Sequence, residues 1–317
     1  MAYNKKDFLD LKTLTADEIQ YIIDSAQKMK YILLSNKSCL TPHLRGKTVA
    51  TLFSEGSSRS KLSYELAAQN LSAKVISLET NQQFMKGESL KDVGKYIDQI
   101  GADFIVMRHP IAGSSHYLAK YVNASIINAG DGQNENPSQS LIDLLTILEI
   151  KQKFEGLKVV MIGDIMHNRV ARSNIWALKK LGVNVNIVAP PTLIPRGIES
   201  TGVNIYTTVA DAVIDADVIM TLRMQENRQK GYLIPSINEY KKLYKLDEQR
   251  LGYAKDDVIV MHPGPINRGI EISSEVIDGK SSLVDKQQVN GVAVRMAIFH
   301  LLNRSGGGLN IERKTFN

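Results

Sequence analysis

Residues 47–67 read KTVATLFSEGSSRSKLSYELA, a short β-branched run followed by a hydroxyl-rich turn and a helical stretch. The same order returns along the first half of the chain, where the runs KVISL, DFIVMR and SIINAG each precede a helical pattern. Strands that alternate with helices in this way predict a parallel sheet covered by helices. The helices are expected to begin near Ser58, Ser89, Ser115 and Pro137.

The alternation pauses at a charged stretch, residues 149–158, and restarts with KVVMIG, VNIVAP, DVIMTLR and DVIVMHPG. We therefore expect an α/β protein with two domains, 1–150 and 151–288, each a parallel sheet flanked by helices. Residues 289–317 are expected to form a C-terminal helix and tail that pack back on the first domain. Thr15 and Glu18 have capping-box spacing, which predicts a helix before the first strand.

The composition is that of a globular protein, with 43% hydrophobic and 23% charged residues among 317. The net charge of +6 comes from scattered lysines and arginines, which argues against nucleic acid as a partner. The single cysteine, Cys39, suits a reducing compartment. Because no signal peptide and no stretch long enough to span a bilayer is recognisable, we expect a soluble, cytoplasmic protein without a membrane partner.

The turn after the first strand predicts a phosphate-binding site. Open α/β sheets bind ligands beyond the carboxyl ends of their strands, and a helix N-terminus attracts anions. Ser57, Ser58 and Ser60 would add hydroxyl donors there, and Arg59 a charged guanidinium. Serine-rich helix starts also occur as plain N-caps, so this string alone leaves both interpretations open.

Two further strand ends favour the anion site. Arg108 follows the third apolar run, and Asn136 and Gln139 stand at the helix start after the fourth run. Because the carboxyl ends of parallel strands lie at one edge of a sheet, we expect these side chains to converge with Ser58–Ser60 on one crevice.

Several other site classes are not indicated. The chain contains no GxxxxGK[ST] loop, no GxGxxG fingerprint after a strand, no HExxH string and no cysteine cluster. Four histidines lie far apart in sequence, without the local spacing of metal ligands: His109, His116, His167 and His262. Neither a metal nor an organic cofactor is therefore expected.

The strand-end motifs resemble those of the carbamoyltransferase family, and the resemblance covers nearly the whole chain. In the first domain the matching positions are Phe53, Glu55, SSRS at 57–60, KGES at 86–89, RHP at 108–110, NAGDG at 128–132 and PSQ at 137–139. In the second domain GDIMHNRVARSN, TLRMQENR and MHPGPINRG are similar to the aspartate-using members. Ornithine-using members would show HCLP and SMG, whereas this chain has Pro263 and Gly264 at the positions of the cysteine and leucine.

The resemblance implies transfer of the carbamoyl group of carbamoyl phosphate to the amino group of L-aspartate, an early step of pyrimidine biosynthesis. By it, carbamoyl phosphate is held by Ser57, Ser58, Arg59, Ser60, Arg108, Asn136, Gln139, Gly264 and Pro265. Aspartate is held by Lys86, Arg169, Arg223 and Gln225. The residues implied in catalysis are Arg59, Ser60, Lys86, Arg108, Asn136 and Gln139. Two arginines in the second domain suit a dicarboxylate acceptor.

The resemblance also implies a homotrimer in which the loop carrying Lys86 reaches a neighbouring active site. A regulatory chain or a dihydroorotase is a further possible partner, and closure of the domains on substrate binding is a hypothesis. Three positions depart from the family pattern: Asn136 replaces a histidine, Gln82 a serine and Gly56 a proline. These departures leave two alternatives open, a carbamoyltransferase for another amine and a weakly active homologue that serves as a binding subunit.

Overall fold

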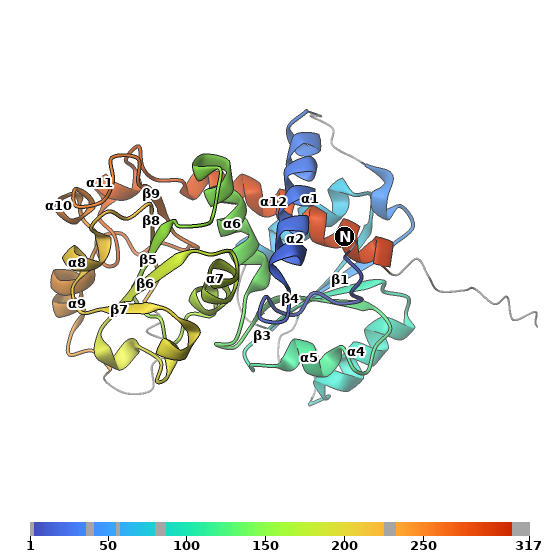
Figure 1. The fold of residues 1–317 in the computed structure, drawn as a ribbon. Coiled ribbons are helices and arrows are strands. Elements are labelled where there is room, and N and C mark those ends of the chain that lie inside the picture. The colour runs from blue at the N-terminus through green and yellow to red at the C-terminus, as the bar shows by residue number, and fades with distance from the viewer. Residues whose placement is uncertain (1–2, 36–40, 55–57, 80–86, 225–232, 306–317) are drawn as a thin grey trace, which may run out of the picture.

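The computed structural model describes residues 3–35, 41–54, 58–79, 87–224 and 233–305. Two α/β domains lie side by side, with helices α6 and α12 between them (Figure 1). The first sheet has the order β2-β1-β3-β4 and the second β7-β6-β5-β8-β9, and every pair of neighbouring strands is parallel. The predicted fold class is therefore confirmed.

The strands are short, as the apolar runs predicted. In the first domain they are β1 Thr48–Phe53, β2 Lys74–Glu79, β3 Phe104–His109 and β4 Ser125–Asp131. In the second they are β5 Lys158–Ile162, β6 Asn184–Val188, β7 Asn204–Tyr206, β8 Val218–Thr221 and β9 Ile259–Met261. Both β1 and β5 lie inside their sheets and carry almost entirely buried side chains, as strands covered on both faces must.

Helices cover both faces of each sheet. Those of the first domain are α1 Ala16–Ser35, α2 Ser58–Asn70, α4 Leu90–Gln99, α5 Ser114–Leu118 and α6 Pro137–Lys151. Those that follow are α7 Arg169–Lys180, α8 Val209–Val213, α9 Ile237–Tyr244, α10 Glu248–Leu251, α11 Ser274–Ile277 and α12 Val284–Ser305. Three short 3₁₀ helices complete the described part, at Pro42–Leu44, Pro191–Leu193 and Ile198–Thr201. No helix in that part is long and apolar enough to cross a membrane.

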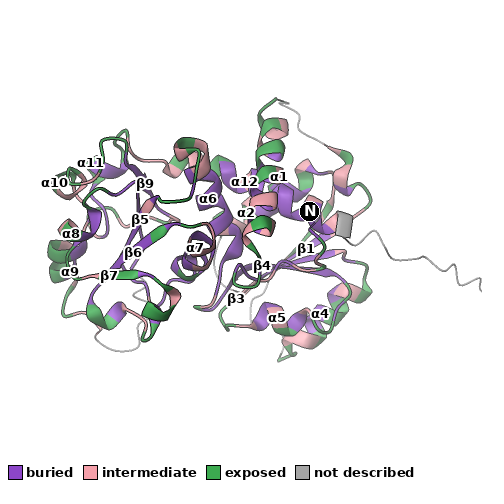
Figure 2. Cartoon of the chain, in the orientation of Figure 1, coloured by how far each residue is buried: buried purple, intermediate pink, exposed green. Residues whose placement is uncertain are grey.

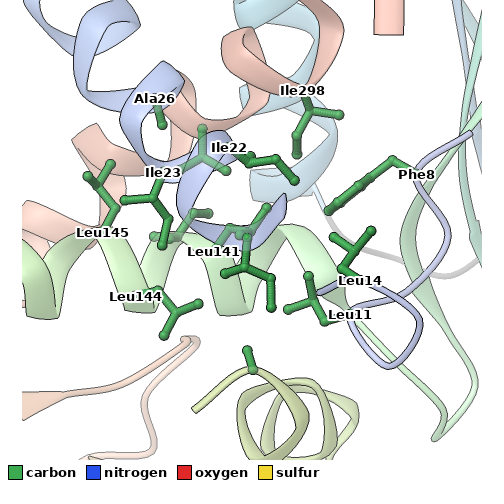
Figure 3. Packing of buried hydrophobic residues seen from close by; sticks show 14 of the residues in the cluster. Phe8, Leu11, Leu14, Ile22, Ile23, Ala26, Leu141, Leu144, Leu145 and Ile298 are labelled. Atoms are coloured by element: carbon green, nitrogen blue, oxygen red, sulfur yellow. The ribbon is translucent and has the colours of Figure 1, made fainter. Parts of the chain in front are cut away.

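Helix α6 is the centre of the hydrophobic core. It is buried along most of its length (Figure 2), and Leu145 lies beside Ile23 of α1, whereas Leu144 projects from the opposite side of the helix (Figure 3). The same cluster of buried side chains continues from the first sheet through α6 and α7 into the second sheet. The two domains therefore share one core, and two smaller clusters fill the far faces of the sheets.

The predicted N-terminal capping box is confirmed. The Thr15 amide donates to the Glu18 carboxylate at 2.8 Å, and the Glu18 amide donates to Thr15 Oγ1 at 3.2 Å. The closing helix contacts α1, α2 and α6, as predicted, but it begins at Val284 rather than near Val289. The first turns of this helix are polar, so the apolar pattern did not reveal them. They pack instead through polar contacts, because Gln287 is buried and its side-chain amide forms hydrogen bonds.

Candidate active site

Two strand ends of the first sheet are joined where the predicted phosphate site begins. Phe53 on β1 is in register with Arg108 on β3, and the Ser54 amide donates to the Arg108 carbonyl at 2.8 Å. Helix α2 begins four residues after Ser54, at Ser58, and the first turn of this helix carries the free backbone amide groups of its N-terminus. Ser58 and Arg59 are exposed and Ser60 is half-buried, whereas Ser57 lies outside the described residues.

Arg59 faces the second domain. A β-carbon placed on Gly264 would lie 3.2 Å from Arg59 Nη1, so the guanidinium rests against the backbone of that residue. Gly264 has φ of +66°, a conformation that favours glycine. The structure thus brings together one residue that follows the first strand and one from the loop after β9, two positions that the family resemblance assigns to one ligand.

The loop after β9 is fixed by a buried histidine. The Gly264 amide donates to His262 Nδ1 at 2.8 Å, so Nε2 carries the ring proton and donates to Glu271 Oε1 at 3.2 Å. Glu271 Oε1 also accepts the Asn267 amide at 2.6 Å. His262 therefore sets the conformation of the backbone that presents Gly264 and the exposed Pro265.

Asn136 is held by a residue of the second domain. Its backbone amide donates to Ser173 Oγ on α7 at 3.0 Å, and this hydroxyl donates to Glu135 Oε2 at 2.8 Å. In its own side chain Oδ1 accepts from Ser138 Oγ at 3.3 Å, which leaves Nδ2 as the donor for a ligand. The sequence prediction of a donor at this position is consistent with this geometry, but the prediction missed Ser173.

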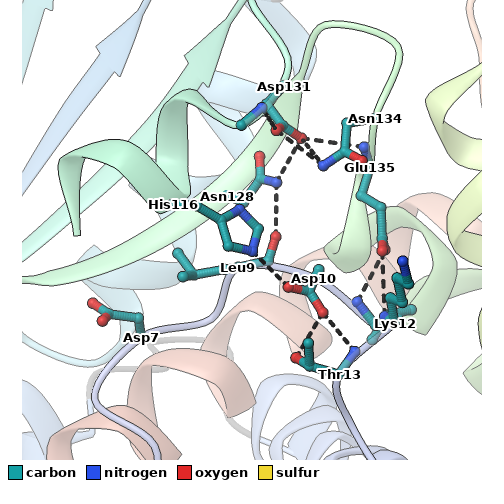
Figure 4. Close-up of polar contacts among 12 residues, drawn as sticks. Asp7, Leu9, Asp10, Lys12, Thr13, His116, Asn128, Asp131, Asn134 and Glu135 are labelled. Carbon is teal, nitrogen blue, oxygen red and sulfur yellow. Dashed lines mark hydrogen bonds and ion pairs between the residues drawn. The ribbon is translucent and has the colours of Figure 1, made fainter. Parts of the chain in front are cut away.

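The loop before Asn136 is also supported by the N-terminal segment (Figure 4). Glu135 accepts the backbone amides of Leu11 and Lys12 at 2.9 and 3.3 Å. Burial raises the pKa of this carboxyl, and its hydrogen bonds oppose the rise. Asp131 accepts from Asn128 Nδ2 at 2.9 Å and holds the far side of the loop.

An ion pair between Asp10 and His116 anchors the N-terminal segment to α5. Asp10 Oδ2 lies 2.7 Å from His116 Nε2, and Oδ1 accepts from the amide and hydroxyl of Thr13. Burial alone would raise the pKa of Asp10, but the hydrogen bonds from His116 and Thr13 prevail and lower it to about 2. The hydrogen bond to Asp10 raises the pKa of His116.

The two candidate arginines of the acceptor site occupy different environments. Arg169 is the first residue of α7 and is only 5% exposed. Its Nη1 donates to the Gly132 carbonyl at 3.2 Å, and a β-carbon on Gly130 would lie 2.8 Å from Nε. Arg169 therefore spans the boundary between the domains, which the sequence did not indicate. Arg223 follows β8 and is half-buried.

The remaining predicted residues are placed as follows. Gln139 lies in the first turn of α6, half-buried, and its Nε2 donates to Asp143 Oδ1 at 3.0 Å. Besides Ser57, the positions Cys39, Glu55, Gly56, Gln82, Lys86 and Gln225 named in the sequence analysis fall outside the described residues. The described site thus combines cationic groups, hydroxyls, amides and a helix N-terminus, a set suited to anionic ligands.

The described histidines have hydrogen-bonding partners of their own. His167 Nδ1 lies 2.9 Å from Asp164 Oδ1, and His109 Nδ1 accepts from the Ile111 amide at 3.1 Å. In the described part of the chain, no three His, Cys, Asp or Glu side chains are grouped so that they could hold a metal ion.

Two family models match the chain. Residues 6–149 match the carbamoyl-P binding domain of aspartate/ornithine carbamoyltransferase, and residues 155–302 match the Asp/Orn binding domain. Together they account for most of the chain, and their border lies close to the expected junction of the domains.

Individual proteins agree with the family models. The chain is 52% identical to the aspartate carbamoyltransferase catalytic subunit of Acetivibrio thermocellus, over 98% of this chain and 100% of that protein. The ornithine carbamoyltransferase from Pyrococcus furiosus superimposes with a TM-score of 0.85 at 29% identity, over 98% and 99% of the two chains. Aspartate transcarbamoylase from Trypanosoma cruzi, solved with carbamoyl aspartate and phosphate, gives 0.84 at 26% identity, over 95% and 97%.

The ion pair between Asp10 and His116 predicts a pH-dependent contribution to stability. Because the pKa of His116 is raised above 6.5, its contribution is complete below that pH and is lost as the pH rises through the raised value. Because the pKa of Asp10 is lowered from 3.8 to about 2, its contribution is present above 3.8 and is lost as the pH falls toward 2. We expect His116→Gln to lower the unfolding temperature by about 1–3 °C between those limits, since the pair is partly exposed.

The measurement is thermal unfolding of both proteins from pH 3 to pH 9. A difference in unfolding temperature that is equally large near pH 5 and near pH 9 would contradict this account.

Proposed function

The chain belongs to the aspartate/ornithine carbamoyltransferase family, and from this premise we propose that it converts carbamoyl phosphate and L-aspartate to N-carbamoyl-L-aspartate and phosphate. The observation that carries the proposal is the 52% identity, over nearly the full length of both chains, to a catalytic subunit named for aspartate. The fold itself does not choose the acceptor, because an ornithine enzyme superimposes equally well. The motif TLRMQ and the pair Pro263 and Gly264 favour aspartate.

In this proposal the phosphate group binds at the N-terminus of α2. Ser57, Ser58 and Ser60 supply hydroxyls, the free amide groups of the first turn point at the ligand, and Arg59 supplies positive charge. The contact between Arg59 and Gly264 supports this assignment, because a phosphate held by Arg59 would then lie beside the backbone of the second domain.

The carbamoyl end is assigned to Ser60, Arg108, Asn136 and Gln139, with backbone groups at Gly264 and Pro265. Asn136 is assigned as the donor for the carbamoyl oxygen, because its own carbonyl oxygen accepts from Ser138 and its NH₂ group carries the donors. Arg108 adds a cation at the neighbouring strand end. These donors would stabilise the negative charge that develops on the carbamoyl oxygen in the transition state.

The two carboxylates of aspartate are assigned to Arg169 and Arg223, with Lys86 and Gln225 completing that part of the site. Arg169 donates to the Gly132 carbonyl in the structure, and a substrate carboxylate is a stronger, charge-assisted acceptor than a peptide carbonyl. Since Arg169 is almost fully buried at the domain boundary, binding there requires an adjustment between the domains.

The reaction then needs no covalent enzyme intermediate. The neutral amine attacks the carbamoyl carbon, a C–N bond forms, and the tetrahedral intermediate expels phosphate as the C–O bond breaks. The proton lost by the amine leaves with the phosphate, so charge and atoms balance without a cofactor. The protein contributes by holding two anions together and by directing donors at the developing oxyanion.

We further propose the division into domains 1–150, 151–288 and 289–317, a cytoplasmic location and a role in pyrimidine biosynthesis. A homotrimer with shared active sites is part of the proposal. Large apolar side chains exposed on the first domain support an interface there: Leu62, Tyr96, Ile100 and Ile111 are each more than half exposed. A regulatory chain or a dihydroorotase as additional partner stays a prediction.

Purified protein supplied with carbamoyl phosphate should form carbamoyl aspartate from aspartate and no product from ornithine or other amines, as measured by a colorimetric ureido assay. Arg59→Ala should lower kcat/KM by about 10²–10³-fold, because it removes a cation from the reacting group. Arg196→Ala, at an exposed position of the second domain, is the matched control and should be unchanged. Product with another amine only would reassign the acceptor, and no product with any amine would favour a binding subunit.

The role of Asn136 can be tested by restoring a donor. Asn136→Ala should lower kcat by about 10–100-fold, because it removes the donor. Asn136→His should retain most of the activity, because the ring N–H of histidine can replace the amide N–H as donor. Asn134→Ala removes an amide from the same loop, where it bonds to Asp131 rather than facing the site, and should change kcat less than twofold. Equal losses in Asn136→Ala and Asn134→Ala would show that the loop, and not the donor, matters.

Shared active sites predict complementation between inactive variants. Lys86→Ala and Arg59→Ala chains should each be nearly inactive, but exchange of subunits between them should restore about a quarter of the wild-type activity. In a random trimer that mixes both chains, one of the three sites receives both intact residues. Sedimentation should give three chains per particle. Trimers that remain inactive after verified exchange would rule out sharing through Lys86.

A further inference from the structure

A buried carboxylate joins three helices behind the candidate site. Asp143 on α6 is 1% exposed, and it accepts side-chain amide N–H groups from all three helices. Gln139 Nε2 on α6 donates to Oδ1 at 3.0 Å, and Gln287 Nε2 on α12 donates to the same oxygen at 2.8 Å. Asn174 Nδ2 on α7 donates to Oδ2 at 2.8 Å. Burial raises the pKa of Asp143 to about 6, so the group is ionised at pH 8.

An ionised carboxylate can only accept hydrogen bonds, so it fixes the orientation of each amide around it. Each amide turns its NH₂ group toward Asp143 and its carbonyl oxygen away. Two of the three carbonyl oxygens confirm this orientation through donors of their own. Asn174 Oδ1 accepts from Ser140 Oγ at 2.7 Å, and Gln287 Oε1 accepts from the His262 amide at 3.1 Å.

The third amide is the one that belongs to the candidate site. Gln139 is half-buried in the first turn of α6, three residues after Asn136. Because one N–H of its NH₂ group is donated to Asp143, the carboxamide is turned with its carbonyl oxygen away from that carboxylate, and this oxygen can receive only a donor. The carbamoyl NH₂ group is such a donor, whereas the phosphate and the carbamoyl oxygen of the same substrate are acceptors.

We propose that Asp143 is a positioning residue that orients the Gln139 carboxamide so that its oxygen recognises the amino group of the carbamoyl substrate. This inference rests on the proposed function and deepens it, since it assigns the orientation of a substrate-binding side chain to a residue that does not touch the substrate. Asp143 also reaches the opposite wall of the site. Through Gln287 it holds the His262 amide, and His262 in turn holds the Gly264 amide.

If Gln139 is oriented in this way, the protein should distinguish between two ligands that have the same shape but differ in one NH₂ group. Phosphonoacetamide carries a carboxamide, and acetonylphosphonate has a methyl group in place of the NH₂. At pH 8 the wild-type protein should bind phosphonoacetamide about tenfold more tightly, because one hydrogen bond to Gln139 is at stake. Isothermal titration calorimetry measures both affinities without requiring turnover.

Asp143→Leu removes the fixed orientation while nearly preserving shape. A leucine has no acceptor oxygen, so nothing at this position holds the Gln139 NH₂ group any longer. The preference for phosphonoacetamide should then fall to about twofold or less, while the affinity for acetonylphosphonate stays within about twofold of wild type. In a Gln139→Met background, Asp143→Leu should change the preference no further, because the two residues act as one unit.

Thr146→Val is the matched control. Thr146 lies almost one turn further along α6 and accepts Asn290 Nδ2 of α12 at 2.9 Å, so it is a buried polar contact between the same two helices. Its loss should leave the ligand preference unchanged, although it also removes a buried hydrogen bond.

The possible results distinguish failure of the orienting role of Asp143 from failure of the proposed carbamoyltransferase function. If Asp143→Leu weakens both phosphonates equally, or if the wild-type protein binds them equally, Asp143 has no orienting role. The wild-type comparison can overturn the inference even if the variant does not fold. If the wild-type protein binds neither phosphonate, the proposed function fails and the inference with it.

Discussion

The contact between α7 and the first domain is the constraint on which the site depends. From this one helix of the second domain, Arg169 bonds the Gly132 carbonyl, Ser173 bonds the Asn136 amide and Asn174 bonds the Asp143 carboxylate. All three side chains are nearly fully buried, so an unmatched partner would carry the full cost of desolvation. The start of α6, which carries Asn136 and Gln139, is therefore shaped by both domains, although its residues belong to the first domain.

This arrangement explains why so many polar groups stand behind the site. A hydrophobic contact could hold α6 against α7, but it would not set the direction of an amide. Hydrogen bonds have direction, and a buried carboxylate surrounded by amide donors admits one arrangement of them. The shared apolar core supplies the stability of the domain pair, and the polar network supplies its geometry.

The local pattern of the sequence predicted much of the fold, because each strand and helix start depends on neighbouring residues. It also indicated Arg59, Asn136 and Gln139, since strand ends of a parallel sheet must meet at one edge. Side chains that act across long sequence separations gave no such signal. Ser173 meets Glu135 across 38 residues, and Gln287 meets Asp143 across 144, so only the tertiary structure brings them together.

Arg169 shows what this coupling means for the substrate. Its guanidinium lies against Gly130 and Gly132, where a β-carbon on Gly130 would not fit. A carboxylate that bound there would draw the guanidinium away from the Gly132 carbonyl and leave that backbone group to find another donor. Arg169 and Ser173 project from the same helix, so a shift of α7 that followed the guanidinium would also displace the hydroxyl that holds the Asn136 amide. With the proposed assignments, α7 would therefore connect the residue that holds the acceptor with the loop that holds the carbamoyl group.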